Sequence, residues 1–226
     1  ATPGNGTPAA LLRLLRETSA RNRLLFGQQD FPFYGCDWAY RPGCCDVKAC
    51  CGDYPAVLGC DLGEIELGTG HNLDGVPFDT MRREIVRQYE RGGLTTVSWH
   101  PRNPLTGGDA FLGWVDLAAD FLNSLSTNDG TTVPVLFRPW HEHTGSWFWW
   151  GQRLCSAAEY EALWKMTVER MRDRGVRMLT VYSPNPCVTG LEYLERYPGD
   201  AWVDILGLDA YHSSDAGAFV TRLGAS

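Results

Sequence analysis

The densest group of chemically capable side chains in this sequence lies between Phe137 and Trp150. There an apolar, β-rich run leads directly into Glu142, which has a histidine on each side and is followed by a run of aromatic residues. Sugar rings stack their apolar faces on indoles, while their hydroxyl groups need charged or planar polar partners. A carboxyl group among tryptophans is desolvated, which favours its protonated form. We therefore predict that Glu142 is a general acid/base acting on a carbohydrate.

Two other interpretations of this segment are open. Glu142 could form a structural ion pair with Arg138, and the aromatic residues could be core. His141 and His143 could instead bind a metal, with His100 and His212 as further ligands at strand ends, although a His-x-His pair is a weak motif by itself. We favour the acid/base interpretation and expect neither a metal nor another cofactor.

The elements that must position Glu142 alternate between short apolar strands and amphipathic helices, which is typical of parallel βα units. The expected strands are Leu24–Gln28, Ala56–Leu62, Thr95–His100, Val133–Arg138, Met178–Tyr182 and Val203–Asp209. The expected helices are Ala9–Thr18, Thr80–Glu90, Trp114–Leu125 and Ala157–Arg174, with Asp79 as a cap and Gly92 as a stop for the second. Polar and aromatic residues follow each strand, where a barrel enzyme keeps its catalytic groups.

These patterns predict an α/β chain with the architecture of a (β/α)8 TIM barrel. A doubly wound open sheet would also bind ligands at strand ends, but no strand is followed by a GxGxxG or GxxxxGK[ST] motif. Only six strands are found where a closed barrel has eight, and 216–226 read as the start of a further helix. We interpret 1–226 as one catalytic barrel domain that is incomplete at its C-terminal end.

The composition of the chain narrows the classes of molecule that the protein could bind. The net charge of −7 and a pI near 5.2 argue against nucleic acid, which requires clustered Lys and Arg. No apolar run approaches the length of a membrane span. We therefore expect an uncharged partner, no nucleic acid, no membrane span, and a monomer.

The cysteines point to an oxidising compartment. Six of the eight lie between Cys36 and Cys60, and the other two are Cys155 and Cys187. Such clustering predicts disulfide bonds, whose pairing stays open; a zinc site is the alternative, although it lacks a CxxC pair. The chain begins at Ala1 without a methionine, as it would after removal of a signal peptide. We expect a secreted protein, either extracellular or periplasmic.

Several motifs together resemble glycoside hydrolase family 26, which is best known for endo-β-1,4-mannanases. They are Phe26-Gly27-Gln28, Gly52-Asp53-Tyr54-Pro55-Ala56-Val57 with Asp61-Leu62, Ser98-Trp99-His100-Pro101 with Asn103-Pro104, the Arg138–Trp150 segment, and Gly207-Leu208-Asp209-Ala210-Tyr211. The last two are the most specific, and the resemblance covers nearly the whole chain. It implies a retaining endo-β-1,4-mannanase that hydrolyses internal bonds of mannan, glucomannan or galactomannan.

The resemblance also implies roles for individual residues. Glu142 becomes the acid/base, His141 lies beside it, and Trp147 is the platform under the sugar next to the cleaved bond. Trp99 and His100 are implied contacts on the glycone side. Arg138, Asp209 and Tyr211 are implied to bind near the nucleophile and to orient it, although Asp209 could simply satisfy a buried arginine and Tyr211 could be a rim aromatic.

The implied nucleophile is a second glutamate on a seventh strand, which the sequence does not contain. A retaining mechanism needs two carboxyl groups about 5 to 5.5 Å apart. Asp61, Glu64, Glu66 and Asp209 are unconvincing substitutes, so we expect the nucleophile beyond residue 226. The alternatives are a β-glucanase (lichenase) or β-1,3-xylanase of the same family, or a fragment that binds sugar without catalysis.

Overall fold

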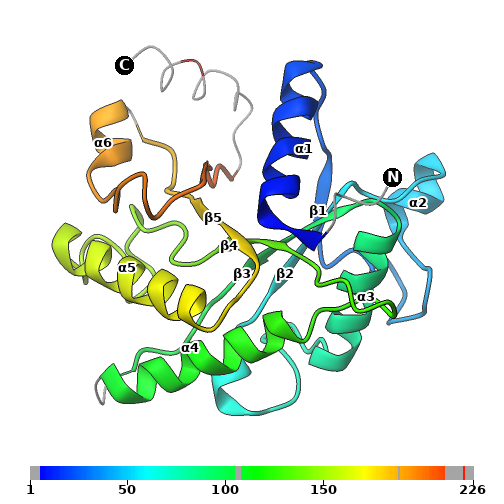
Figure 1. Cartoon of the computed structure of the whole chain (residues 1–226), viewed down its shortest axis with the longest axis horizontal. Helices are drawn as coiled ribbons and strands as arrows, with labels where there is room; N and C mark the ends of the chain where they lie inside the picture. The colour runs from blue at the N-terminus through cyan, green and yellow to red at the C-terminus, as the bar shows by residue number, and fades with distance from the viewer. Residues whose placement is uncertain (1–5, 105–107, 188, 212–220, 222–226) are drawn as a thin grey trace. The chain divides into compact units, whose positions relative to one another are not determined.

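The computed structural model describes residues 6–104, 108–187, 189–211 and 221, and its strands form one sheet in the order in which they occur in the sequence (Figure 1). The strands are β1 Gly27–Gln29, β2 Val57–Asp61, β3 Leu94–Ser98, β4 Val135–Arg138, β5 Met178–Tyr182 and β6 Ile205–Leu206. Pairing is parallel in β1–β2, β2–β3 and β5–β6, with registers such as Val57 beside Leu94 and Val181 beside Ile205. The predicted α/β class with successive parallel strands is confirmed.

The four expected helices are present as α1 Pro8–Ala20, α3 Phe78–Glu90, α4 Gly108–Asn123 and α5 Ala157–Asp173. Three short elements were not predicted: α2 Asp46–Cys51, α6 Gly190–Leu194 and the 3₁₀ helix η2 Ile65–Leu67. None of the three is long enough to show a helical period of apolar residues. A capping box at Thr189 and Glu192, in which each residue's side chain binds the other's backbone N–H, was the available signal for α6.

The start of α3 differs from the prediction. The helix begins at Phe78 after Pro77, so Asp79 lies in its first turn rather than at the cap. There it is 2.5 Å from the guanidinium of Arg82 and near the positive end of the helix dipole. The predicted stop is confirmed, because Gly92, which follows the C-cap residue Arg91, has a φ of 92°.

The two outermost strands are shorter than expected. β1 starts at Gly27, and Leu24, which was predicted to open it, is 91% exposed. β6 consists of only two residues, and Asp209 lies beyond it. The helix expected over 216–226 falls outside the described residues, apart from residue 221.

Two compact units can be distinguished, one of residues 1–137 with 171–179 and one of residues 138–170 with 180–226. In the first, Leu58 and Val97 of the sheet and Met81 and Ile85 of α3 belong to the buried core. The core of the second is aromatic, and its largest fully buried side chains are Trp140, Trp150, Tyr160, Trp164 and Tyr182. The single-domain interpretation stays a prediction.

Candidate active site

Glu142 lies in a tight turn that follows β4. Both Trp140 and Glu142 have left-handed backbone conformations, with φ values of 52° and 54°. For residues other than glycine such conformations cost about 1–3 kcal/mol each and are found preferentially at functional sites. The turn brings the Glu142 side chain to an almost buried position, with 8% of the residue exposed. The carboxyl group is thus placed by the backbone at a cost in stability.

Trp147 is directly linked to that carboxyl group. Its indole Nε1 donates a hydrogen bond to Glu142 Oε2 at 3.0 Å, while 61% of the residue is exposed. The ring lies against the backbone of Gly145, where an added Cβ would be 2.4 Å from a ring carbon. Gly145 is therefore needed to seat the indole, which presents an apolar surface beside Glu142.

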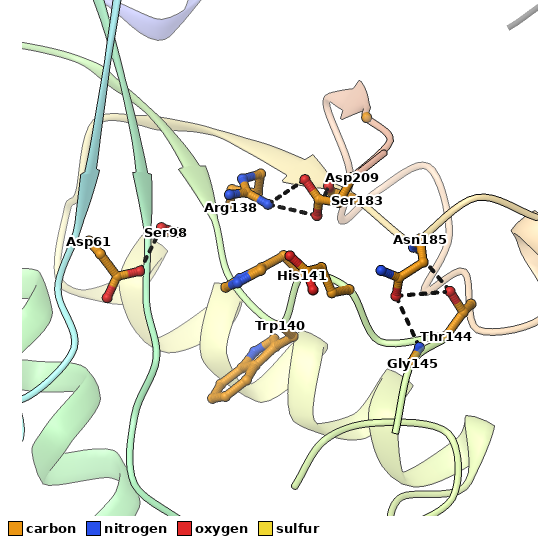
Figure 2. Close-up of polar contacts among 12 residues, drawn as sticks. Asp61, Ser98, Arg138, Trp140, His141, Thr144, Gly145, Ser183, Asn185 and Asp209 are labelled. Atoms are coloured by element: carbon orange, nitrogen blue, oxygen red, sulfur yellow. Dashed lines mark hydrogen bonds and ion pairs between the residues drawn. The ribbon is translucent and has the colours of Figure 1, made fainter. Parts of the chain in front are cut away.

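Arg138, at the end of β4, pairs with Asp209 (Figure 2). Among the described residues, no ion pair joins it to Glu142. Its Nη1 lies 2.8 and 2.7 Å from the two carboxylate oxygens of Asp209, and Ser183 donates to the same carboxylate at 2.5 Å. Burial raises the pKa of Asp209, and the Arg138 guanidinium and the Ser183 hydroxyl oppose that rise. Asp209 thus pairs with a largely buried arginine. The Glu142 carboxyl group instead accepts a hydrogen bond from Trp147.

Tyr211 and His141 lie in the same unit as Glu142. Partial burial and the nearby Glu142 carboxylate raise the pKa of Tyr211, although the residue as a whole is 68% exposed. His141 is buried against the rings of Phe148 and Trp150, at centroid distances of 5.4 and 6.0 Å. Both therefore lie in the surroundings of Glu142, Tyr211 at the rim and His141 inside.

An open pocket of about 380 Å³ extends from Trp147 towards the end of β5. Its walls include Thr144, Gln152, Asn185 and Glu195. Asn185 Oδ1 accepts hydrogen bonds from Gly145 N at 3.0 Å and from Thr144 Oγ1 at 3.3 Å (Figure 2). With its oxygen occupied, the amide is oriented so that its NH₂ group can donate to a ligand. The pocket thus combines an indole, an amide donor and a carboxylate.

A second polar cluster, in the other unit, lies where β2 and β3 end. Asp61 Oδ2 is 2.6 Å from His100 Nδ1 and accepts from Ser98 Oγ at 2.6 Å, and Asp61 Oδ1 accepts from Gly63 N at 2.6 Å. Although burial acts in the opposite direction, these partners hold the pKa of Asp61 below its ordinary value. Trp99 Nε1 donates to Glu66 at 3.4 Å. Trp99 and His100 are therefore each anchored by a carboxylate of the same unit.

A comparison with models of protein families shows to which family the residues of this site belong. The model of glycosyl hydrolase family 26 matches residues 108–223, which contain the Glu142 turn, Trp147 and Asp209. The chain belongs to glycosyl hydrolase family 26.

Individual family members are similar over most of this chain. A solved family 26 β-mannanase from Bacteroides ovatus superimposes with a TM-score of 0.89 at 46% identity, covering 96% of this chain and 70% of that one. A mannan endo-1,4-β-mannosidase from Bifidobacterium adolescentis is 34% identical over 88% of this chain, and one from Bacillus subtilis 30% over 73%. This chain covers only 22% and 52% of the lengths of those two relatives.

The sequence also raised expectations about disulfide bonds, a metal site and a membrane span. All eight cysteines are free thiols in the structure, so the expected disulfides remain a prediction. Within the described residues, no three His, Cys, Asp or Glu side chains gather as a metal site, and no helix among them is long and apolar enough to cross a membrane. His143 is enclosed by the rings of Tyr160 and Tyr182, and His212 lies outside the described residues.

The structure also brings in residues that sequence reasoning did not assign to the site. Ser183 and Asn185 reach it from the end of β5, and their position after a strand was the available signal. Tyr160, on α5, reaches the Glu142 turn from a position that looks like ordinary helix core in the sequence. Trp99 and His100 belong to the other unit.

Proposed function

We propose that this chain is the catalytic part of a retaining endo-β-1,4-mannanase, with Glu142 as the acid/base. The observation that carries the proposal is the 3.0 Å bond between Glu142 and the exposed indole of Trp147 in a chain of family 26. A sugar stacked on that indole has its glycosidic oxygen next to the carboxyl group. Glu142 then donates its proton to the leaving oxygen and afterwards removes one from the attacking water.

The proposed substrate is a β-1,4-linked mannan, glucomannan or galactomannan, in line with the names of the relatives. The pocket beyond Trp147 would receive sugar units of the leaving group, with Asn185 donating to hydroxyl groups and Glu195 accepting from them. Trp99 and His100 would contact the glycone. No metal or cofactor enters this mechanism.

The proposed nucleophile is a glutamate outside the 226 residues. Within the chain, Asp209 is occupied by Arg138 and Ser183, and Asp61 by His100 and Ser98. Glu66 accepts from Trp99 and from the Arg102 amide. We further propose that the protein is secreted as a monomer and that its cysteines pair after export.

The test is reducing-sugar release from glucomannan, galactomannan, barley β-glucan and β-1,3-xylan by the natural full-length protein and its Glu142→Gln variant. We expect cleavage of the two mannans and a loss of at least about a hundredfold in the variant, because the proton donor is removed while shape is kept. A variant with unchanged rate would refute the role of Glu142. Preference for β-glucan or xylan would assign the chain to another activity of the family.

A second candidate is sugar binding without catalysis by the 226-residue chain itself. It is favoured by the engagement of the Asp209 carboxylate, near Glu142, by Arg138 and Ser183. Calorimetric binding of mannohexaose by the 226-residue chain, without turnover, would support this candidate. Turnover by that short chain would show that a second carboxylate among its own residues performs the attack.

A further inference from the structure

The strained turn that carries Glu142 is held by hydrogen bonds to successive backbone groups. Tyr160 Oη donates to the carbonyl oxygen of Trp140 at 2.9 Å, and Trp150 Nε1 donates to that of His141 at 2.9 Å. The amide of Glu142 donates to the carbonyl oxygen of Ser183 at 2.8 Å. Because Trp140 and Glu142 are both in the left-handed region, the turn persists only where such contacts outweigh the strain.

Tyr160 differs from the other groups at this turn because it comes from α5, a helix that supplies none of the predicted site residues. Its side chain is fully buried, with its ring against His143 at 4.4 Å between centroids and the guanidinium carbon of Arg196 5.3 Å from the ring centroid. Burial holds the pKa of Tyr160 well above its ordinary value, so the hydroxyl group remains a donor. Enclosed in this way, Tyr160 can affect a reaction only through the backbone that it holds.

We propose that Tyr160 is a positioning residue: its hydrogen bond to the Trp140 carbonyl keeps the turn in the conformation that presents the Glu142 carboxyl group to Trp147 and to the substrate. The inference rests on the proposed function for its kinetic consequences, but its structural part does not. Without the bond, one of the contacts that outweigh the strain of the turn is lost, so Trp140 and Glu142 shift towards ordinary φ values and the carboxyl group is displaced. A displacement of about 1 Å at a reacting group can cost on the order of a hundredfold in rate.

Tyr182 provides a matched control. It is also fully buried, its ring also contacts His143, at 4.8 Å, and its hydroxyl group also donates to a backbone carbonyl, that of Tyr193, at 2.8 Å. Tyr182→Phe therefore removes the same group from the same kind of surroundings without touching a carbonyl of the Glu142 turn. The two substitutions should lower the melting temperature by similar amounts.

The experiment compares wild type, Tyr160→Phe and Tyr182→Phe by amide hydrogen exchange and by kinetics on mannan. For Tyr160→Phe we expect the Glu142 amide to exchange at least about tenfold faster, and kcat of the full-length protein to fall about tenfold with KM within about twofold. Tyr182→Phe should match wild type in both. Equal exchange at the Glu142 amide in the two variants, or equal kcat, would overturn the proposal.

The exchange measurement separates this inference from the proposed function. If wild type does not cleave mannan, the proposed function fails, yet faster exchange confined to Tyr160→Phe still shows that Tyr160 holds the turn. If wild type cleaves mannan and both variants behave alike, only the role of Tyr160 fails. The exchange experiment, like the kinetics, uses the full-length protein.

Discussion

At the scale of single residues, the surroundings of His143 decide whether it acts as a metal ligand or as a packing element. As part of a His-x-His pair it was a candidate metal ligand, yet it is fully buried and neither ring nitrogen has a hydrogen-bond partner among the described residues. Burial, followed by the nearby Arg196 guanidinium, lowers the pKa of His143 from 6.5 to about 3. The imidazole is therefore a neutral, ring-shaped packing element behind the Glu142 turn.

This low pKa predicts an acid-sensitive stability. Between about pH 6.5 and pH 3 the unfolded chain binds a proton at His143 that the folded chain does not, so stability falls as the pH falls through this range. The limiting slope is about 1.4 kcal/mol per pH unit. His143→Phe should flatten the dependence of the unfolding free energy on pH, as measured by urea denaturation at pH 4.5, 5.5 and 6.5, values about one pH unit apart in that range.

The exposed His71 provides the control for that experiment. His71→Phe makes the same substitution at an exposed position, so it separates the burial of His143 from the mere loss of an imidazole. An unchanged slope in His143→Phe would mean that His143 becomes protonated in the folded state as readily as in the unfolded one.

At the scale of elements, the segment from Gly145 to Gly151 forms a closed aromatic loop that displays Trp147. The amide of Gln152 donates to the carbonyl of Gly145 at 3.0 Å and that of Gly151 to Phe148 at 2.9 Å. A Cβ on Gly151 would lie 2.6 Å from the Gly145 carbonyl oxygen and 2.9 Å from that of Phe148. The loop closes only because Gly151 has no side chain.

We therefore expect Gly151→Ala to open this loop. The clash is with backbone, so it should cost roughly 1–3 kcal/mol of stability, and the shifted indole should raise KM for mannan. Gly113→Ala is the matched control, because Gly113 lies in the interior of α4 and a Cβ there would meet nothing within 4 Å. It should stabilise the protein by about 0.4–1 kcal/mol with unchanged KM. Thermal melting and kinetics distinguish these outcomes, and a stable Gly151→Ala variant with normal KM would contradict the role of the loop.

At the scale of the whole molecule, charge bears on which polymer the protein binds. The chain has 27 acidic and 20 basic side chains, hence a net charge of −7. Mannans are uncharged, and the exposed group that we assign to them next to Glu142 is an indole. Binding should therefore depend on stacking and hydrogen bonds, which salt screens little.

The prediction is a KM on glucomannan that changes by less than about twofold between about 50 and 500 mM NaCl. Carboxymethylated mannan is the control: the acidic protein repels this polyanion, so its KM should decrease as salt screens the repulsion. A steep salt dependence on unmodified glucomannan would show that charge contributes to its recognition.

The sequence alone determined the order of strands and long helices, the parallel α/β class and the position of Glu142 at the end of β4. These features are local: periodicity, flanking glycines and the polar residues after a strand can all be read within a short window. The family resemblance added Trp147, Asp209 and Tyr211 as site residues, and their roles in catalysis stay predictions.

Only the tertiary structure decided which groups meet. Arg138 could have paired with Glu142, four residues away, but pairs with Asp209, which is far away in the sequence and reaches it from beyond β6. In the same way, a tyrosine of α5 holds the turn of Glu142, and a histidine of the H-x-H pair lies between two tyrosines. Such partners are set by the packing of distant segments, because burial and hydrogen-bond geometry depend on three-dimensional neighbours that no local pattern encodes.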